Sequence, residues 1–96
     1  MMAVSQIDSA ARPRLAPHRR LHHDKARDCW TIQAPERVFV LDEPGHAIVS
    51  RCNGENTIAE IVDQLCAVYG EAAREPISAD VLALVRDFAS KGVMAW

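Results

Sequence analysis

The spacing of apolar residues changes once along this chain, at Asp42, and this change constrains the fold more than any other feature. Before it, residues 29–33 and 37–42 alternate with a period of two, which is typical of strands. After it, apolar residues recur every three or four positions, which is typical of helices. This order predicts an α+β fold of the winged helix-turn-helix type. In it, a small antiparallel sheet of two to three strands is followed by three helices.

The two strand segments are separated by a short turn, in which Pro35 suits the first central position. We therefore expect an antiparallel hairpin, and a weaker strand signal covers residues 19–24. In the second strand Val38 and Val40 face one way, while Phe39 and Leu41 face the other. A strand that is apolar on both faces has two interpretations. Either the fold covers both faces, or the strand lies at a sheet edge and offers its free amides to another extended chain.

Three helices are expected after residue 42. The first begins at Asp42, Glu43 and Pro44. The second covers residues 57–69 and begins with a capping box of Thr57 and Glu60. The third covers residues 78–91, with Ser78 as its N-cap. Its core stripe consists of Val81, Leu84, Val85 and Phe88. The chain ends in an apolar segment that either packs inside the domain or forms a homodimer contact: Val93, Met94 and Trp96.

The length of 96 residues bounds the chain to one domain, because each hydrophobic core needs on the order of 100 residues. Residues 1–17 are mostly small and polar, so we expect a disordered N-terminal tail there and a folded domain over residues 18–96. No segment reaches the roughly 18–20 apolar residues of a membrane span, and the first residues do not resemble a secretory signal. We therefore expect no membrane partner. Three widely spaced cysteines, in a chain without a secretory signal, predict free thiols in a cytoplasmic protein.

No group of residues in the sequence supports catalysis or metal binding. His22 and His23 are neighbours on an expected strand, so their side chains point to opposite faces and cannot share a metal ion. Cys52 and His46 lie six positions apart (52 − 46), which places them on different faces of a helix. No phosphate loop or nucleophile motif occurs. We therefore expect no catalytic residue, no metal and no cofactor, so the chain is not an enzyme.

The alternative function is that of a winged-helix DNA-binding regulator, and the charge of the reading helix tests it. The helix expected over residues 57–69 contains Glu60 and Asp63 but no lysine or arginine. The helix expected over residues 78–91 has equal numbers of acidic and basic residues. Neutralisation of phosphates drives most of the affinity of proteins for DNA, and acidic helices oppose it. We therefore expect no nucleic-acid partner.

Residues 12–96 resemble the pyrroloquinoline quinone biosynthesis protein D (PqqD) family. The features that carry the resemblance are, in chain order, Arg20-Leu21, the turn Pro35-Glu36, Asn53-Gly54 before the cap Thr57, and a leucine-rich helix that ends before Gly92. Two positions depart from the family pattern. Arg37 replaces a glycine that often follows the turn, and Asn53 replaces the usual aspartate.

The resemblance implies a peptide-recognition element with a winged helix-turn-helix fold. Such a protein acts as a peptide chaperone: it binds the ribosomally made precursor peptide of pyrroloquinoline quinone and presents it to a radical SAM enzyme, which joins a glutamate to a tyrosine in the precursor. In relatives of this fold the peptide adds as a strand beside a groove lined by the third helix. Carried over to this chain, the peptide-binding residues are Arg37, Val38, Phe39, Val40 and Leu41 on the strand, with Val81, Leu84, Val85 and Phe88 on the helix.

Overall fold

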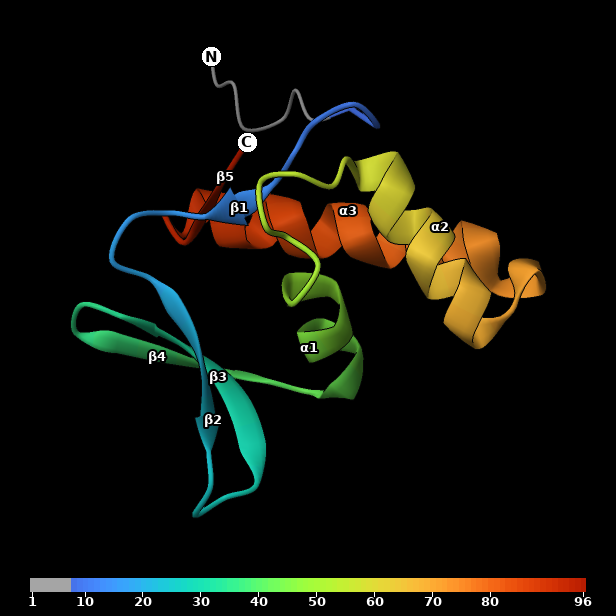
Figure 1. The fold of residues 1–96 in the computed structure, drawn as a ribbon. Helices are drawn as coiled ribbons and strands as arrows, with labels where there is room; N and C mark the ends of the chain where they lie inside the picture. Colours follow the sequence, from blue (N-terminus) through green and yellow to red (C-terminus); the bar gives the residue numbers. More distant parts are fainter. Residues whose placement is uncertain (1–7) are drawn as a thin grey trace.

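The computed structural model describes residues 8–96 and contains a three-stranded antiparallel sheet in the order β2-β3-β4. The strands are β2 (Arg20–Asp24), β3 (Cys29–Ala34) and β4 (Arg37–Leu41). The β3–β4 register runs from Ala34↔Arg37 to Trp30↔Leu41, so the hairpin and the weaker first strand expected from the sequence are both confirmed. Figure 1 shows this sheet projecting from one side of the helices.

The turn between β3 and β4 consists of Pro35 and Glu36, and Glu36 adopts the unusual backbone conformation that the turn requires. This residue has a φ of 63°, in the left-handed region. A proline followed by a left-handed residue is the pattern of a type II turn. Arg37 is not among the residues with positive φ, so the arginine that replaces the family's glycine sits in ordinary strand backbone.

The three expected helices are α1 (Glu43–Val49), α2 (Ile58–Tyr69) and α3 (Arg74–Ser90), with a short 3₁₀ turn η2 (Glu71–Ala73) before α3. A carboxylate oxygen of Asp42 caps α1 by accepting a hydrogen bond from the Gly45 N–H at 2.8 Å. Both bonds of the capping box between Thr57 and Glu60 are present at the start of α2. The fold class and the expected starts of α1 and α2 are therefore confirmed.

The third helix begins earlier than expected. It starts at Arg74, about one turn before Ser78, so the prediction of Ser78 as the N-cap is wrong. Pro76 lies in the first turn, where a backbone N–H has no partner within the helix and its loss costs little. The earlier start adds Ile77 to the helix, and this residue lines a cavity together with residues of α1 and α2.

The expected disordered tail is wrong for residues 8–17, while residues 1–7 of that prediction lie outside the described part of the chain. Strand β1 (Arg14–Leu15) pairs with β5 (Met94–Ala95) near the C-terminus, and Pro13 is fully buried. The carbonyl of Ala11 also accepts a hydrogen bond from the N–H of Ile58 at 2.9 Å. Sequence patterning missed this segment because its order comes from distant parts of the chain, not from a period of its own. The folded unit therefore begins before residue 18.

The core joins the helices to one face of the sheet. Ile32 and Leu41 contribute from the sheet, and the helices contribute most of the rest. Val93 and Met94 are 1% and 4% exposed, so these two residues pack inside the monomer instead of forming a homodimer contact, and Trp96 is half-buried against the same core. Among the described residues, no helix is both long and apolar enough to cross a membrane.

Candidate functional site

Strand β4 has one edge that no strand of the described chain covers, because β3 lies on its other side. In an antiparallel pair, the backbone groups of successive residues point alternately toward the partner strand and away from it. Arg37 flanks the two-residue turn and therefore pairs with Ala34, and Phe39 and Leu41 follow it in facing β3. The N–H and C=O groups of Val38 and Val40 consequently face the open edge. This edge is a template for one more extended strand.

The side chains of β4 divide between two environments. Leu41 is buried in the core and Phe39 is half-buried on the same face. Val38 and Val40 point to the opposite face and are 61% and 63% exposed, so two β-branched residues lie beside the open edge without cover from the described chain. The guanidinium of Arg37 lies 4.7 Å from the centre of the Phe39 ring. A strand added to this edge would therefore find apolar contacts on both of its faces.

A groove of about 520 Å³ lies next to this strand, between the beginning of α1 and the exposed side of α3. Phe39 connects the two features, because its ring meets the ring of Phe88 edge to face with 5.7 Å between centroids. We call this the α1–α3 groove. Its lining residues are Asp42, Pro44, Gly45, Ile48, Asp80, Ala83, Leu84, Asp87 and Phe88.

The structure divides the helical residues that the sequence assigned to the site. Leu84 and Phe88 line the α1–α3 groove. Val81 and Val85 are fully buried, so they hold α3 in the core and cannot touch a peptide, and their assignment to the site is wrong. The stripe predicted for α3 therefore divides: Val81 and Val85 belong to the core alone, while Leu84 and Phe88 also line the groove.

The sequence did not identify several of the residues that line the groove, among them Pro44, Ile48, Asp80 and Ala83. A signal for part of this set exists: Asp80, Ala83 and Asp87 recur at spacings of three and four, one position before members of the core stripe. The contribution of α1 has no such signal, because it depends on how α1 packs against α3.

The groove is acidic. The Asp42 carboxylate is used as the cap of α1, and the Asp87 carboxylate accepts a hydrogen bond from the Lys91 ammonium group at 2.8 Å. Among residues 8–96, no ion pair or hydrogen bond engages the Asp80 carboxylate. None of the described residues that line the groove is a lysine or an arginine. It therefore favours a ligand that is apolar and carries positive charge.

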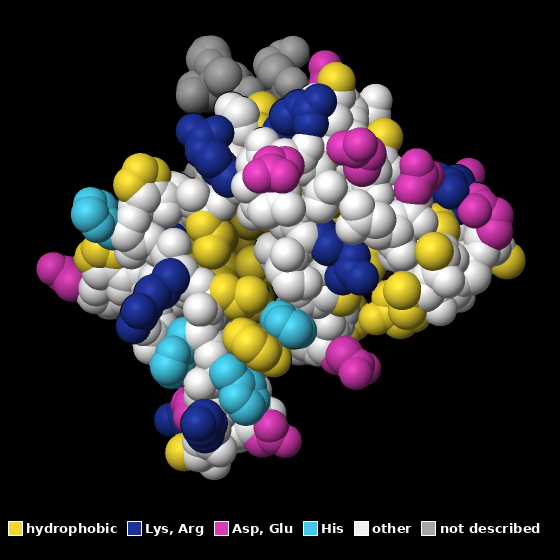
Figure 2. Space-filling model, in the orientation of Figure 1, with side chains coloured by type: hydrophobic (Ala, Val, Ile, Leu, Met, Phe, Trp, Pro, Cys, Tyr) yellow, Lys and Arg dark blue, Asp and Glu magenta, His cyan; other side chains and the backbone are white. Residues whose placement is uncertain are grey.

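A histidine–tryptophan stack lies at the end of the sheet near α1. The Trp30 ring is stacked on the His46 ring with 4.4 Å between centroids. The His23 ring is tilted against the Trp30 ring, with 4.9 Å between their centroids. Burial lowers the pKa of His46, and the charges of Arg51 and His23 lower it further. Figure 2 shows hydrophobic side chains in a hollow between the sheet and the helices, beside several histidines.

The remaining reactive side chains do not form a chemical site. In the described part of the chain, no three histidine, cysteine or acidic side chains come together in a way that could hold a metal ion. Burial raises the pKa of the Cys52 thiol to about 12, so it is protonated and unreactive at neutral pH. Cys66 is buried and Cys29 is half-buried, and all three thiols are free. Among residues 8–96, none of the three thiols is hydrogen-bonded to a side chain that could act as its base.

The candidate reading helices are also poor partners for DNA. In α2 the charged residues are Glu60 and Asp63, and Asp63 already pairs with Arg74 at 2.8 Å. The same guanidinium also pairs with Glu71, so Arg74, one of the two arginines of α3, is engaged by two carboxylates. Little positive charge is left on these helices for phosphates.

The chain matches the protein-family model described as Coenzyme PQQ synthesis protein D (PqqD) over residues 29–94, which is more than half of its length. Similar curated relatives are named PqqA binding protein. The one from Bradyrhizobium diazoefficiens is 42% identical over 88 residues, covering 92% of this chain and 84% of the relative. The one from Xanthomonas oryzae pv. oryzae is 35% identical over 91 residues, covering 95% and 98%.

A solved structure has the same fold. The solution NMR structure of the PqqD truncation of Methylobacterium extorquens PqqCD superposes with a TM-score of 0.82 at 32% identity, covering 99% of this chain and all of that one. It is described as a functional, stand-alone recognition element for ribosomally synthesized and post-translationally modified peptides. These proteins are named for binding and not for a reaction, in agreement with the prediction that the chain is not an enzyme. The matched residues, the similar relatives and the shared fold establish that the chain belongs to the PqqD family.

Proposed function

We propose that this chain binds PqqA, the precursor peptide of pyrroloquinoline quinone, by strand addition at the open edge of β4. The observation that carries the proposal is the combination of an uncovered strand edge and an apolar groove beside it, joined through Phe39 and Phe88. The names of the relatives supply the ligand, because they are described as PqqA binding proteins. Phe39, Leu84 and Phe88 then contact peptide side chains, and Arg37 and Leu41 bound the strand that receives the peptide.

The open edge by itself gives too little affinity. It offers the two N–H and two C=O groups of Val38 and Val40, each worth roughly 0.5–1.5 kcal/mol net when hydrogen-bonded. Ordering each peptide residue costs about 1–2 kcal/mol, so the backbone bonds alone do not hold a peptide of five residues. Each buried leucine-sized side chain contributes roughly 1.5–3 kcal/mol. Binding near micromolar, about −8 kcal/mol, therefore needs two or three apolar anchors in the groove.

The groove is large enough for these anchors. Its volume of about 520 Å³ compares with the roughly 150 Å³ that accommodates one benzene-sized group. Val38 and Val40 also favour apolar peptide residues on the outer face, next to their exposed side chains. The peptide segment that pairs with β4 should therefore be apolar on both faces, unlike a strand with one solvated face.

We further propose that the bound precursor is presented to the radical SAM enzyme that links its glutamate and tyrosine. The support is membership of the PqqD family and the lack, among the described residues, of a group able to perform such chemistry itself. Holding the peptide as a strand restricts its conformations while leaving residues outside the paired segment accessible to an enzyme.

The direct test is calorimetric titration with synthetic PqqA, with a scrambled peptide of the same composition as control. We expect a 1:1 complex with a dissociation constant near or below micromolar for PqqA and no measurable heat for the scrambled peptide. Duplex DNA at about 100 mM salt should show no electrophoretic shift up to tens of micromolar protein. Equal binding of both peptides, or a sequence-specific DNA shift, contradicts the proposal.

The presentation step needs a separate measurement. The rate of the Glu–Tyr crosslink in PqqA is measured with the radical SAM enzyme, with and without this chain. We expect the crosslink to form faster, or at lower peptide concentration, when the chain is present. If PqqA binds to the chain but the crosslinking rate is the same with and without it, the presentation step is contradicted and the binding proposal stands.

A further inference from the structure

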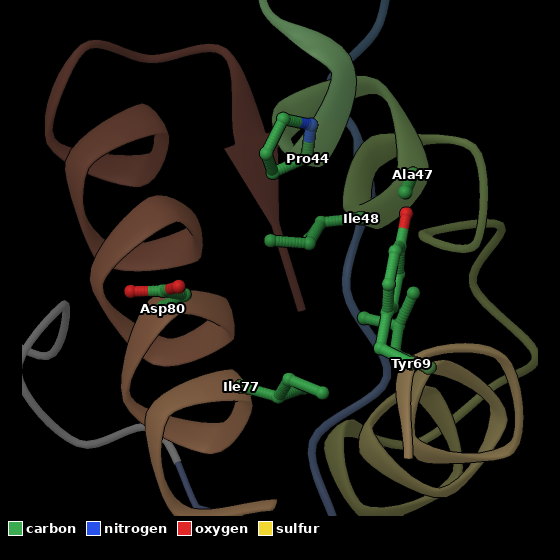
Figure 3. Close-up of a pocket in the computed structure, with 7 residues that line it drawn as sticks. Pro44, Ala47, Ile48, Tyr69, Ile77 and Asp80 are labelled. Atoms are coloured by element: carbon green, nitrogen blue, oxygen red, sulfur yellow. The ribbon is translucent and has the colours of Figure 1, made fainter. Parts of the chain in front are cut away.

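A second, smaller cavity lies between α1, α2 and α3, with a volume of about 170 Å³. We call it the three-helix cavity. In Figure 3 the side chains of Ile48 and Ile77 point into the space between α1 and α3, and the Tyr69 side chain reaches toward Ala47. Its polar groups are the Asp80 carboxylate and the Tyr69 hydroxyl. Its lining residues are Pro44, Ala47, Ile48, Leu65, Tyr69, Ile77 and Asp80.

The three-helix cavity continues the α1–α3 groove. Pro44, Ile48 and Asp80 line both, so the two hollows share a wall. The groove also includes Phe88, near the end of α3 that Phe39 contacts, whereas the cavity includes Ile77, near the beginning of α3. A peptide that follows the groove from the middle of β4 past Asp42 is therefore led toward the three-helix cavity.

The cavity suits one large apolar side chain. A volume of about 170 Å³ is close to the roughly 150 Å³ that holds a benzene-sized molecule in an apolar cavity. Tyr69 is 54% exposed, and among the described residues its hydroxyl makes no hydrogen bond. An incoming side chain can therefore be covered by the Tyr69 ring without breaking a hydrogen bond between described residues.

The negative charge of Asp80 favours a particular kind of residue next to the apolar side chain in the peptide. Asp80 lies where the groove and the cavity meet, it is exposed, and no described residue engages its carboxylate. The other two acids of the groove, Asp42 and Asp87, are already engaged. A lysine or arginine next to the apolar anchor is the complement of this arrangement.

We infer that the three-helix cavity binds an aromatic or leucine side chain from the precursor peptide, just outside the segment that pairs with β4, while Asp80 pairs with a neighbouring lysine or arginine. This inference rests on the proposed function. An added strand pairs more stably when antiparallel. The residues beside the C-terminal end of β4 then belong to the N-terminal side of the paired segment, so the anchor precedes that segment in the precursor.

The first experiment fills the cavity. Ala47→Phe occupies it from α1, and Ala67→Phe makes the same change at an exposed position of α2 that lines neither hollow. Synthetic full-length PqqA should bind Ala47→Phe about tenfold more weakly than wild type, the loss expected for one buried anchor, and should bind Ala67→Phe unchanged. Tyr69→Ala, at a side chain more than half exposed, tests the same wall without disturbing the core and should weaken binding several-fold.

The second experiment shortens the peptide. PqqA peptides lacking successive N-terminal residues should lose affinity in one step, when the anchor is removed. Beyond that step, the shortened peptide should bind wild type and Ala47→Phe equally. If Ala47→Phe and Tyr69→Ala bind full-length PqqA as wild type does, the inference is overturned while the strand-addition site stands. If wild type binds no PqqA peptide, both the inference and the proposed function fail.

The third experiment removes the charge. Asp80→Asn should weaken PqqA binding about threefold to tenfold at low salt, and the difference should shrink at about 500 mM salt because the ion pair is exposed. Glu75→Gln removes one negative charge from the same helix outside both hollows and should leave the affinity unchanged. Equal affinity of Asp80→Asn and wild type at low salt overturns the assignment of Asp80.

Discussion

The ring of Phe39 on β4 meets the ring of Phe88 on α3 edge to face, with 5.7 Å between the ring centroids and 70° between the ring planes. This contact fixes the edge strand against the helix that forms the wall of the groove. Phe88 is 8% exposed and Phe39 is half-buried, so the pair belongs partly to the core and partly to the groove floor. The spacing of strand and helix therefore depends on the same two rings that a bound peptide would contact.

A double-mutant cycle measures the energy of this pair. We expect Phe39→Leu and Phe88→Leu to be coupled by about 0.5–1.5 kcal/mol in the free energy of unfolding, the range found for edge-to-face aromatic pairs. Urea denaturation of the four proteins gives the coupling. Additive effects would show that the two rings touch without interacting beyond their burial.

Proline substitutions distinguish the open edge of β4 from its paired edge. Val38→Pro and Val40→Pro remove N–H groups that face the open edge, so each variant should fold and should lose at least tenfold in affinity for PqqA. Phe39→Pro is the matched control, because its N–H faces β3 and its loss should destabilise the fold itself. Circular dichroism separates folding from binding. Unchanged binding by both folded valine variants would place the peptide elsewhere.

Leu84 tests the groove wall without unfolding the domain. It is half-buried, so Leu84→Ala should cost about 1 kcal/mol in stability and reduce the affinity for PqqA about tenfold. Leu82 is also half-buried on α3 but lies outside the groove, so Leu82→Ala should cost similar stability and leave affinity unchanged. Titration calorimetry and thermal melting give both quantities. Equal affinities of the two variants would contradict a role for Leu84.

The N-terminal segment should contribute strongly to stability. A chain of residues 17–96 lacks the buried Pro13, the β1–β5 pair and the carbonyl that accepts from Ile58. Compared with a chain of residues 8–96, we expect a loss of about 2–3 kcal/mol and a melting temperature lower by about 10–20 °C. A shift of only a degree or two would mean that these contacts add little.

His46 should make the fold sensitive to mild acid. Its pKa in the folded protein is lowered from the ordinary value of 6.5, chiefly by burial, so below about pH 6.5 the unfolded state binds a proton first. Stability is therefore complete above that pH and decreases as the pH falls toward the lowered pKa. His46→Gln should flatten this decrease between about pH 7 and pH 5. Urea midpoints across this range provide the measurement, and identical slopes for wild type and His46→Gln contradict it.

Much of the fold could be predicted from the sequence because its determinants are local. The alternation in residues 37–41 and the capping box of Thr57 and Glu60 each act within a few residues, and both are present in the structure. The motifs that resemble the PqqD family could be recognised in the sequence for the same reason. Family membership followed from residues whose order and spacing are visible without coordinates.

Other features depend on contacts between distant segments. Nothing local in residues 8–17 indicates that they are ordered, because Pro13 is buried by groups that come from elsewhere in the chain. The periodicity of α3 marked Val81 and Val85 as a stripe but could not tell core from groove, since that depends on which side of the helix α1 and the sheet occupy. The sequence by itself determined the elements and the family. Tertiary packing decided which edge of β4 stays open and which side chains of α3 face it, because burial is settled between segments and not along them.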